Sequence, residues 1–243
     1  MPDARRVLIT GAAGDVSGIL RHHWDHDRYA LRLADIVDVP DPGDHETLHM
    51  DITDLDAFRA ACEGIDTVIH LAADRSPSAD FYETLLDLNI IGTYNAFQAA
   101  ADAGCRRVVF ASSVNAVIGY SESGIGRVLE DDVMYPANVY GATKCWGEAL
   151  GGVFSHKHGV SSIAVRLGSP RFDQSRDWDP NRRNGSISPR DTAQFFGCCV
   201  DVEDLPFAIV HGSSRHVRSE MDIAETCRIL GYEPQDGTAF PRA

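Results

Sequence analysis

Short apolar runs rich in β-branched residues alternate along the chain with longer stretches in which apolar residues recur every three to four positions. The short runs predict strands, and the longer stretches predict amphipathic helices. The runs at 7–9, 68–69 and 108–110 contain no polar residue, as expected of strands that are covered on both faces. Strands that alternate with helices in this way favour an α/β fold with a doubly wound parallel sheet.

The pattern divides the 243 residues into a series of elements within one expected domain, residues 1–243. The predicted strands are Arg6–Thr10, Ala30–Ala34, Glu46–His49, Thr67–Leu71, Arg107–Ala111, Ser162–Arg166 and Phe207–Val210. The predicted helices are Asp15–His23, Leu55–Cys62, Leu85–Ala103, Val139–His158, Pro189–Val200 and Ser219–Leu230. The polar stretch from Pro170 to Ser188 is predicted to be a loop, and long loops in compact domains often carry function.

A glycine-rich turn, Thr10-Gly11-Ala12-Ala13-Gly14-Asp15-Val16-Ser17, follows the first predicted strand and opens a helix. Gly11 permits a tight turn, and Gly14 lets the backbone approach a pyrophosphate that the helix N-terminus stabilises. This context predicts dinucleotide binding by a Rossmann-type fold.

Two acids lie where such a fold binds the adenosine half of a dinucleotide. Asp35, at the end of the second predicted strand, can accept hydrogen bonds from ribose hydroxyls and would repel a 2′-phosphate, which predicts NAD as the cofactor. Asp51 can meet the adenine amino group, and small residues after His70 let a cofactor lie against the backbone. The predicted cofactor-binding residues are Gly11, Ala13, Gly14, Asp15, Val16, Asp35, Ile36, Asp51, Ile52, Leu71, Ala72, Ala73, Asn89, Tyr140 and Lys144.

Tyr140 and Lys144 stand four residues apart and therefore share one face of a predicted helix. A nearby ammonium favours the phenolate and is expected to lower the tyrosine pKa, which would make Tyr140 a general base for an alcohol proton. Ser113, at the end of the fifth predicted strand, can hold the substrate oxygen. Asn89 is a further polar candidate.

These motifs together resemble the extended, or atypical, short-chain dehydrogenase/reductase superfamily of the NAD-dependent epimerase/dehydratase type. The resemblance implies a catalytic set of Asn89, Ser113, Tyr140 and Lys144, in which Lys144 also holds the nicotinamide ribose. The chain departs from the family at Ser17, where a third glycine is usual.

A narrower resemblance links the chain to uronate dehydrogenases and to the related short-chain-type NAD-dependent glucose-6-phosphate dehydrogenases, which oxidise C1 of an aldose to a lactone. The segments that carry it are Asn89–Asn95, Phe110–Ser113, Arg166–Ser169 and the short C-terminal part. Those enzymes usually have Asn-His after the serine pair, whereas this chain has Val114-Asn115. Arg75 stands where uronate dehydrogenases place a substrate-binding serine, with Ser76 next to it.

The resemblance therefore implies a sugar substrate, with residues from about 167 to 243 contributing a small substrate-binding part. The expected substrate residues are Arg75, Ser76, Ser113, Asn115, Tyr140, Ser169 and Arg182. Because guanidinium groups bind carboxylates and phosphates, these arginines favour an anionic sugar, either a uronate or a sugar phosphate. We also expect a homodimer formed through helices 85–103 and 139–158, whose apolar stripes include Ala96, Phe97, Ala100, Ala149, Leu150, Val153 and Phe154.

Two other functions fit the same motifs. A nucleotide-sugar epimerase or dehydratase would retain its NAD and return the hydride, but such enzymes usually have a larger C-terminal part than the 77 or so residues after Arg166. A catalytically silent NAD-sensing protein would typically lose the tyrosine and lysine that this chain keeps.

The composition indicates which classes of partner the protein is not expected to bind. A net charge of −14 argues against binding to nucleic acid, which needs a basic face. No stretch approaches the ~20 apolar residues of a membrane helix, and no signal-peptide pattern is present, so we expect a cytoplasmic protein without membrane contact. The six cysteines form no C-x-x-C pair, and His22, His23 and His26 lack a recognised metal spacing, so no metal is expected.

Overall fold

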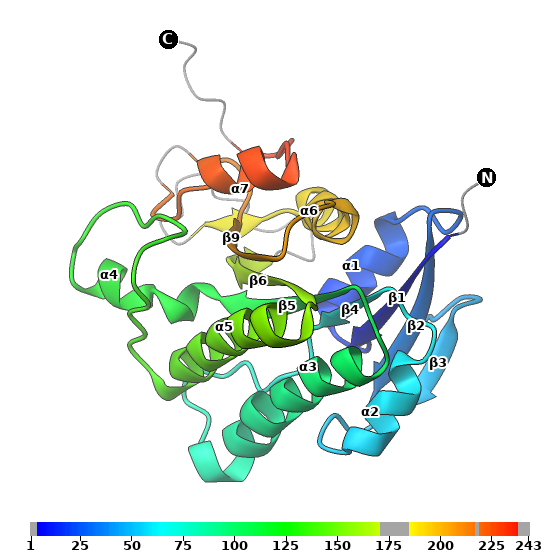
Figure 1. Cartoon of the computed structure of the whole chain (residues 1–243). Helices are drawn as coiled ribbons and strands as arrows, with labels where there is room; N and C mark the ends of the chain where they lie inside the picture. The colour runs from blue at the N-terminus through cyan, green and yellow to red at the C-terminus, as the bar shows by residue number, and fades with distance from the viewer. Residues whose placement is uncertain (1–3, 171–184, 217–218, 238–243) are drawn as a thin grey trace.

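A seven-stranded parallel sheet forms the centre of the molecule (Figure 1). The structure, a computed structural model, describes residues 4–170, 185–216 and 219–237. The strands are β1 (Arg5–Thr10), β2 (Tyr29–Asp35), β3 (Glu46–His49), β4 (Thr67–His70), β5 (Arg107–Ser113), β6 (Ser161–Leu167) and β9 (Phe207–Gly212). Their order in the sheet is β3-β2-β1-β4-β5-β6-β9. β2 and β3 lie on one side of β1 and the later strands lie on the other, so the strand order reverses between β1 and β4. The predicted Rossmann-type fold is confirmed.

Helices cover both faces of this sheet. One face packs against α1 (Asp15–His23) and α6 (Pro189–Asp201), and the other against α2 (Leu55–Cys62), α3 (Gly92–Asp102) and α5 (Val139–His158) (Figure 1). Successive residues of a strand pack into the hydrophobic cores on opposite faces of the sheet. In β1, Val7 and Ile9 face the layer of α1 and α6, and Leu8 faces the layer of α2, α3 and α5. This alternation explains the apolar runs of the central strands β1, β4 and β5, which have no solvent-facing side there.

Two predicted helices have different limits in the structure. The helix expected at 85–103 begins earlier, as the wide π-helical segment η1 (Phe81–Ile91), and continues as α3. The carboxylate of Asp80 starts η1 by accepting hydrogen bonds from the amides of Tyr82 and Glu83. The helix expected at 219–230 begins only at Ala224, as α7 (Ala224–Leu230). The residues before it are not helical: Met221 pairs with Val128, whose carbonyl accepts a hydrogen bond from the Asp222 amide.

The segments that follow β5 and β6 contain short elements that the pattern of apolar and polar residues did not predict. They are η2 (Val114–Ala116), α4 (Ile118–Glu122), β7 (Ser169–Pro170) and β8 (Ser186–Ile187). The last two strands pair with each other. Because Pro170, Ser186 and Ile187 belong to these strands, the prediction of a loop from Pro170 to Ser188 is wrong at both ends of that segment. Arg182, an expected substrate residue, lies outside the described residues. Among the residues that the structure describes, no helix is long and apolar enough to cross a membrane.

The apolar stripes of the two long helices mostly face inward. Ala96, Phe97, Ala100, Leu150 and Phe154 are all buried in the core of their own chain. The expectation that these five side chains form a dimer surface is therefore wrong. The pattern marked a buried face correctly, but helical periodicity alone does not tell an internal core from a subunit interface.

Candidate active site

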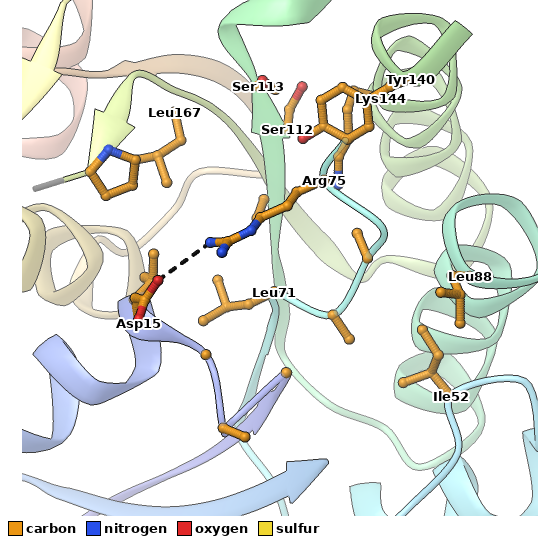
Figure 2. A pocket seen from close by; sticks show the side chains of 18 of the residues that line it. Asp15, Ile52, Leu71, Arg75, Leu88, Ser112, Ser113, Tyr140, Lys144 and Leu167 are labelled. Atoms are coloured by element: carbon orange, nitrogen blue, oxygen red, sulfur yellow. Dashed lines mark hydrogen bonds and ion pairs between the residues drawn. The ribbon is translucent and has the colours of Figure 1, made fainter. Parts of the chain in front are cut away.

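A cavity of about 750 Å³ opens at the carboxyl ends of the strands and runs from the glycine turn to the start of α5 (Figure 2). It crosses the sheet where β1 and β4 lie side by side, which is the point at which the strand order reverses. Ligands of open α/β sheets bind at this point because the loops that leave neighbouring strands diverge there.

The glycine turn lies against the backbone after β4. Gly11 has a φ of +70°, and a Cβ at this position would lie 2.7 Å from the amide nitrogen of Ala72. Gly14 precedes α1, and no side chain caps the first amides of that helix. The turn therefore leaves backbone donors facing the cavity, in a space too narrow for a larger residue. Such a cradle fits the pyrophosphate of a dinucleotide.

Asp35 is held at the end of β2 by this same turn. One carboxylate oxygen accepts a hydrogen bond from the Ala13 amide at 2.9 Å, and the other accepts one from Val37 at 3.2 Å. The half-buried carboxylate lines the cavity and retains lone pairs for further donors. Its position beside the pyrophosphate cradle suits the hydroxyls of an adenosine ribose.

Further along the cavity, Asp51 follows β3. One of its oxygens accepts hydrogen bonds from the amide and the hydroxyl of Thr53, both at 2.8 Å, and the side chain is exposed. Ile36, which is 56% exposed, and the buried Ile52 provide apolar surfaces at the same end. The combination of an acid and two isoleucines fits an adenine ring.

Tyr140 and Lys144 lie at the opposite end of the cavity, on the first turns of α5 (Figure 2). Both are buried, and the Lys144 ammonium lies 5.5 Å from the centroid of the Tyr140 ring and 5.1 Å from that of Phe110. Burial raises the pKa of Tyr140, while a polar contact with the Ser113 hydroxyl and the charge of Arg75 act in the opposite direction. Burial lowers the pKa of Lys144 to about 8.

The expected depression of the tyrosine pKa by Lys144 is therefore absent from this structure. Desolvation by burial is the largest cause of both pKa shifts: it disfavours the phenolate of Tyr140 and the ammonium of Lys144. A positively charged group bound in the cavity would favour the phenolate, since an opposite charge nearby lowers a phenol pKa.

Close packing against β5 fixes the position of α5. A Cβ at Gly147 would lie 2.2 Å from the Phe110 ring, and a Cβ at Gly141 would lie 2.3 Å from the Asn115 carbonyl oxygen. Asn138 caps the helix by accepting a hydrogen bond from Gly141 at 2.8 Å, and its amide donates to Asn115 at 2.9 Å. These contacts bring Tyr140 next to the end of β5.

A buried ionic network lies behind the tyrosine and the lysine. Glu148, one turn after Lys144, accepts a hydrogen bond from the Ser112 hydroxyl at 2.6 Å and two from the Arg166 guanidinium, at 3.0 and 2.9 Å. Glu148 is fully buried and Arg166 is 1% exposed. The network joins α5 to both β5 and β6.

Apart from Arg182, which lies outside the described residues, the predicted site residues fall into two groups. The cavity is lined by all the predicted cofactor residues except Asn89, by Ser113, and by Arg75, Asn115 and Ser169 of the expected substrate set. Asn89 and Ser76 do not line the cavity. The Asn89 amide instead exchanges hydrogen bonds with the backbone of Asp74 and donates to Thr143, and the Ser76 amide donates to the Asp74 carboxylate. Both residues shape the loop after β4.

Arg75 extends from this loop across the cavity (Figure 2). Its side chain is 81% exposed, and one of its terminal nitrogens lies 3.4 Å from the carboxylate of Asp15 at the start of α1. Its charge also acts on the Tyr140 phenol. Arg75 therefore stands between the catalytic end of the cavity and the glycine turn.

Sequence reasoning missed several lining residues, most of them apolar. They are Met50, Leu88, Ala111, Ser112, Val114, Leu167, Gly168 and Pro170. Their shared signal is a place at or just beyond a strand end, which holds for all except Leu88 of η1. Leu167, Gly168 and Pro170 bring the C-terminal third of the chain into the cavity wall.

The fold and this site define a nucleotide-dependent enzyme of the Rossmann class, and comparison with known proteins specifies the family. Residues 7–172 match the model of the NAD dependent epimerase/dehydratase family, so the chain belongs to that family. The predicted family and its NAD cofactor are thereby confirmed.

Relatives of similar length show which members of the family the chain resembles. The chain is 34% identical to an NAD-dependent glucose-6-phosphate dehydrogenase of Haloferax volcanii, over 96% of this chain and 94% of that protein. It is 30% identical to a uronate dehydrogenase of Pseudomonas syringae, over 98% and 84%. The structure of a uronate dehydrogenase from Agrobacterium tumefaciens, a mutant form complexed with NAD, superposes with a TM-score of 0.85 at 29% identity, covering 96% of this chain and 86% of that one.

Proposed function

We propose that this protein is an NAD-dependent sugar dehydrogenase that oxidises C1 of an aldose to its lactone. One observation carries the proposal: Tyr140, Lys144 and Ser113 converge at one end of a cavity whose other end holds the glycine turn and Asp35. The relatives named above, which are dehydrogenases of a sugar phosphate and of uronates, support this substrate class.

The reaction removes two hydrogens from the sugar, one as a proton and one as a hydride. Ser113 orients the C1 hydroxyl, and Tyr140 as phenolate takes its proton. The C1–H bond then breaks with its electron pair as the C1–O bond becomes a carbonyl, which in a ring sugar is a lactone. Bound NAD⁺ supplies the acceptor for that hydride. Lys144 would hold the nicotinamide ribose of bound NAD through its ammonium, and the closely packed α5 keeps the phenol in place.

Net formation of NADH distinguishes this function from its alternatives. The protein, NAD⁺ and a panel of uronates, sugar phosphates and neutral aldoses are mixed, and absorbance of the reduced nicotinamide is followed. Reduction with at least one sugar supports the dehydrogenase. Conversion of a nucleotide sugar without net reduction would assign an epimerase or dehydratase, and the absence of any conversion would favour an NAD-sensing protein.

The sugar is an anion in this proposal, because Arg75 offers an exposed guanidinium inside the cavity of a protein with net charge −14. Arg75→Ala is expected to lower kcat/KM for the preferred uronate or sugar phosphate by about tenfold or more, since a hydrogen bond to a charged group contributes roughly 1.5–3 kcal/mol. Steady-state kinetics with galacturonate, glucuronate, glucose 6-phosphate and glucose measure this.

Arg59→Ala is the matched control, because Arg59 is also a paired surface arginine but lies on α2 and contacts Asp56 and Asp102. It should leave the kinetics unchanged. A native preference for neutral glucose, or unaltered kinetics in Arg75→Ala, would reject anion recognition by Arg75 and leave the dehydrogenase proposal standing.

NAD is expected to be preferred to NADP, because a 2′-phosphate would meet the Asp35 carboxylate. Asp35→Ala should weaken NADH binding by about tenfold, because it removes charge-assisted ribose hydrogen bonds. It should weaken NADPH binding less, because the loss of hydrogen bonds is offset there by the loss of repulsion. Fluorescence titration with both nucleotides checks the change, with the exposed neighbour Asp38→Ala as control. Equal or tighter binding of NADPH by the native protein would contradict the assignment.

A homodimer remains part of the proposal, with other residues than the buried stripes. The exposed apolar side chains Ile91, Tyr94, Trp146 and Val153 lie on or next to α3 and α5 and are 39–51% exposed. Light scattering should give a dimer mass for the native protein and a monomer mass for Trp146→Glu. Val133→Glu, at a 77% exposed residue outside these helices, should stay dimeric. A monomer mass for the native protein at micromolar concentration would refute the dimer.

A further inference from the structure

One arginine outside the catalytic machinery joins three backbone segments around the glycine turn. The guanidinium of Arg21, on α1, donates one hydrogen bond to the Ala12 carbonyl at 2.6 Å and one to the Ser17 hydroxyl at 3.0 Å, both from the same nitrogen. Its other terminal nitrogen donates to the Pro40 carbonyl at 3.0 Å. Ala12 belongs to the glycine turn, and Pro40 belongs to the loop that follows Asp35.

Ser17 explains why the arginine can bind there. The residue is fully buried, at the position where a third glycine is usual, and its hydroxyl oxygen lies one helical turn before Arg21. A glycine at this position has no side-chain oxygen to accept a hydrogen bond. The departure from the glycine pattern is therefore matched by a partner that uses the extra oxygen.

The loop at 36–40 has little else to hold it against α1. A second cavity of about 590 Å³ lies along the glycine turn and α1, and Pro40 is the residue of this loop that lines it. Among the hydrogen bonds of the described residues, the one from Arg21 to Pro40 is the one that joins α1 to this loop. Val39 packs against the core, whereas Ile36 and Val37 are more than half exposed.

Two of the three acceptors belong to segments that line the adenosine half of the main cavity, although Ala12, Ser17 and Pro40 do not line it themselves. On one wall, Ala12 precedes Ala13, whose amide donates to Asp35. On the other wall, Ile36 follows Asp35 and provides an apolar face. A change in the spacing between the turn and the loop would move the carboxylate, the pyrophosphate cradle and the adenine surface relative to one another.

We infer that Arg21 is a positioning residue for the dinucleotide, which sets the affinity for its adenosine half by tying the glycine turn to the loop after Asp35. A guanidinium suits this role because its donors are fixed in one plane and stay charged, so that it bonds several carbonyls in a set geometry. Holding the empty site in its binding geometry reduces the ordering that a ligand must impose. The inference rests on the proposed binding of NAD, but not on which sugar is oxidised.

Equilibrium binding tests the inference without any turnover. NADH is titrated by its fluorescence, and ADP-ribose, which lacks the nicotinamide, is titrated by displacement of NADH. Arg21→Met is expected to raise both dissociation constants by about tenfold, because both ligands contain the adenosine half. Arg21→Lys, which keeps the charge but not the planar set of donors, should fall between native and Arg21→Met. Ser17→Gly should raise both constants by about twofold to threefold.

Catalysis separates positioning from a general loss of structure. At saturating NAD⁺ and sugar, kcat of Arg21→Met should stay within about twofold of native while KM for NAD⁺ rises, since Tyr140 and Lys144 lie at the other end of the cavity. Arg59→Met, an equally charged surface position on α2, should change neither constant.

Three outcomes would overturn the inference. They are native-like binding of NADH by folded Arg21→Met, weakened NADH binding with ADP-ribose binding unchanged, and an equal loss in Arg59→Met. If no sugar is oxidised by any variant, the proposed reaction fails, but the two binding titrations still decide the role of Arg21.

Discussion

Tyr140→Phe is expected to lower kcat for sugar oxidation by a hundredfold to ten-thousandfold, while the dissociation constant for NADH stays within about twofold of native. General-base steps contribute about this much to enzymatic rates, and phenylalanine removes only the proton acceptor. The ring itself is 7% exposed and packs beside the Lys144 ammonium, so phenylalanine keeps the same shape in the same space.

Tyr94→Phe is the matched control, because it removes an exposed phenol that bonds Gln98 on α3, away from the cavity. Its kcat should equal the native value. Single-turnover reduction of bound NAD⁺ separates the chemical step from product release. A Tyr140→Phe protein that retains more than a tenth of native kcat would remove Tyr140 from the mechanism, and a large loss of NADH affinity would show that the variant does more than remove the base.

The parts of the site that could be predicted are those whose signal is local in the sequence. The glycine turn, Asp35 and the Tyr140 and Lys144 pair each depend on residues within a few positions of a strand end or on one helix face. Parallel strands bring their carboxyl ends to one edge of the sheet, so local motifs at several strand ends meet without further information.

The parts that could not be predicted depend on contacts between distant segments. Leu88 lines the cavity because η1 approaches it in the folded chain, and no motif marks this residue. The direction of the Tyr140 pKa shift is another case. The spacing revealed the nearby lysine, but only the packed structure reveals the burial that raises the pKa of Tyr140.

Asn89 lies at a motif position that is typical of catalysis, but its hydrogen bonds in the structure hold a loop. Its place in a motif indicated catalysis, whereas its amide nitrogen donates to the Asp74 carbonyl and the Thr143 hydroxyl and its amide oxygen accepts from the Asp74 amide. Any effect of Asn89 on the reaction would be indirect, because Asn89 holds the loop after β4, and this loop contains Arg75. Its assignment as a catalytic residue stays a prediction.

Glu148→Gln is expected to lower the free energy of unfolding by about 3–5 kcal/mol, because it leaves the Arg166 guanidinium buried without a compensating charge. Glutamine keeps the shape of the side chain, so the loss reports charge and hydrogen bonding instead of a cavity. A loss of that size is a large share of the roughly 5–15 kcal/mol that stabilises a typical folded protein. Urea denaturation of the native and variant proteins measures the difference.

Glu225→Gln provides the comparison at the surface. Glu225 pairs with Arg228 on α7, and both side chains are about half exposed or more, so this change should cost less than about 1 kcal/mol. The double variant Glu148→Leu, Arg166→Met should regain much of the stability lost in Glu148→Gln, since an apolar pair of similar volume needs no charge balance. Equal losses for the two glutamine variants would show that the buried network contributes no more than a surface ion pair, and α5 would then owe its position to the close glycine contacts with β5 alone.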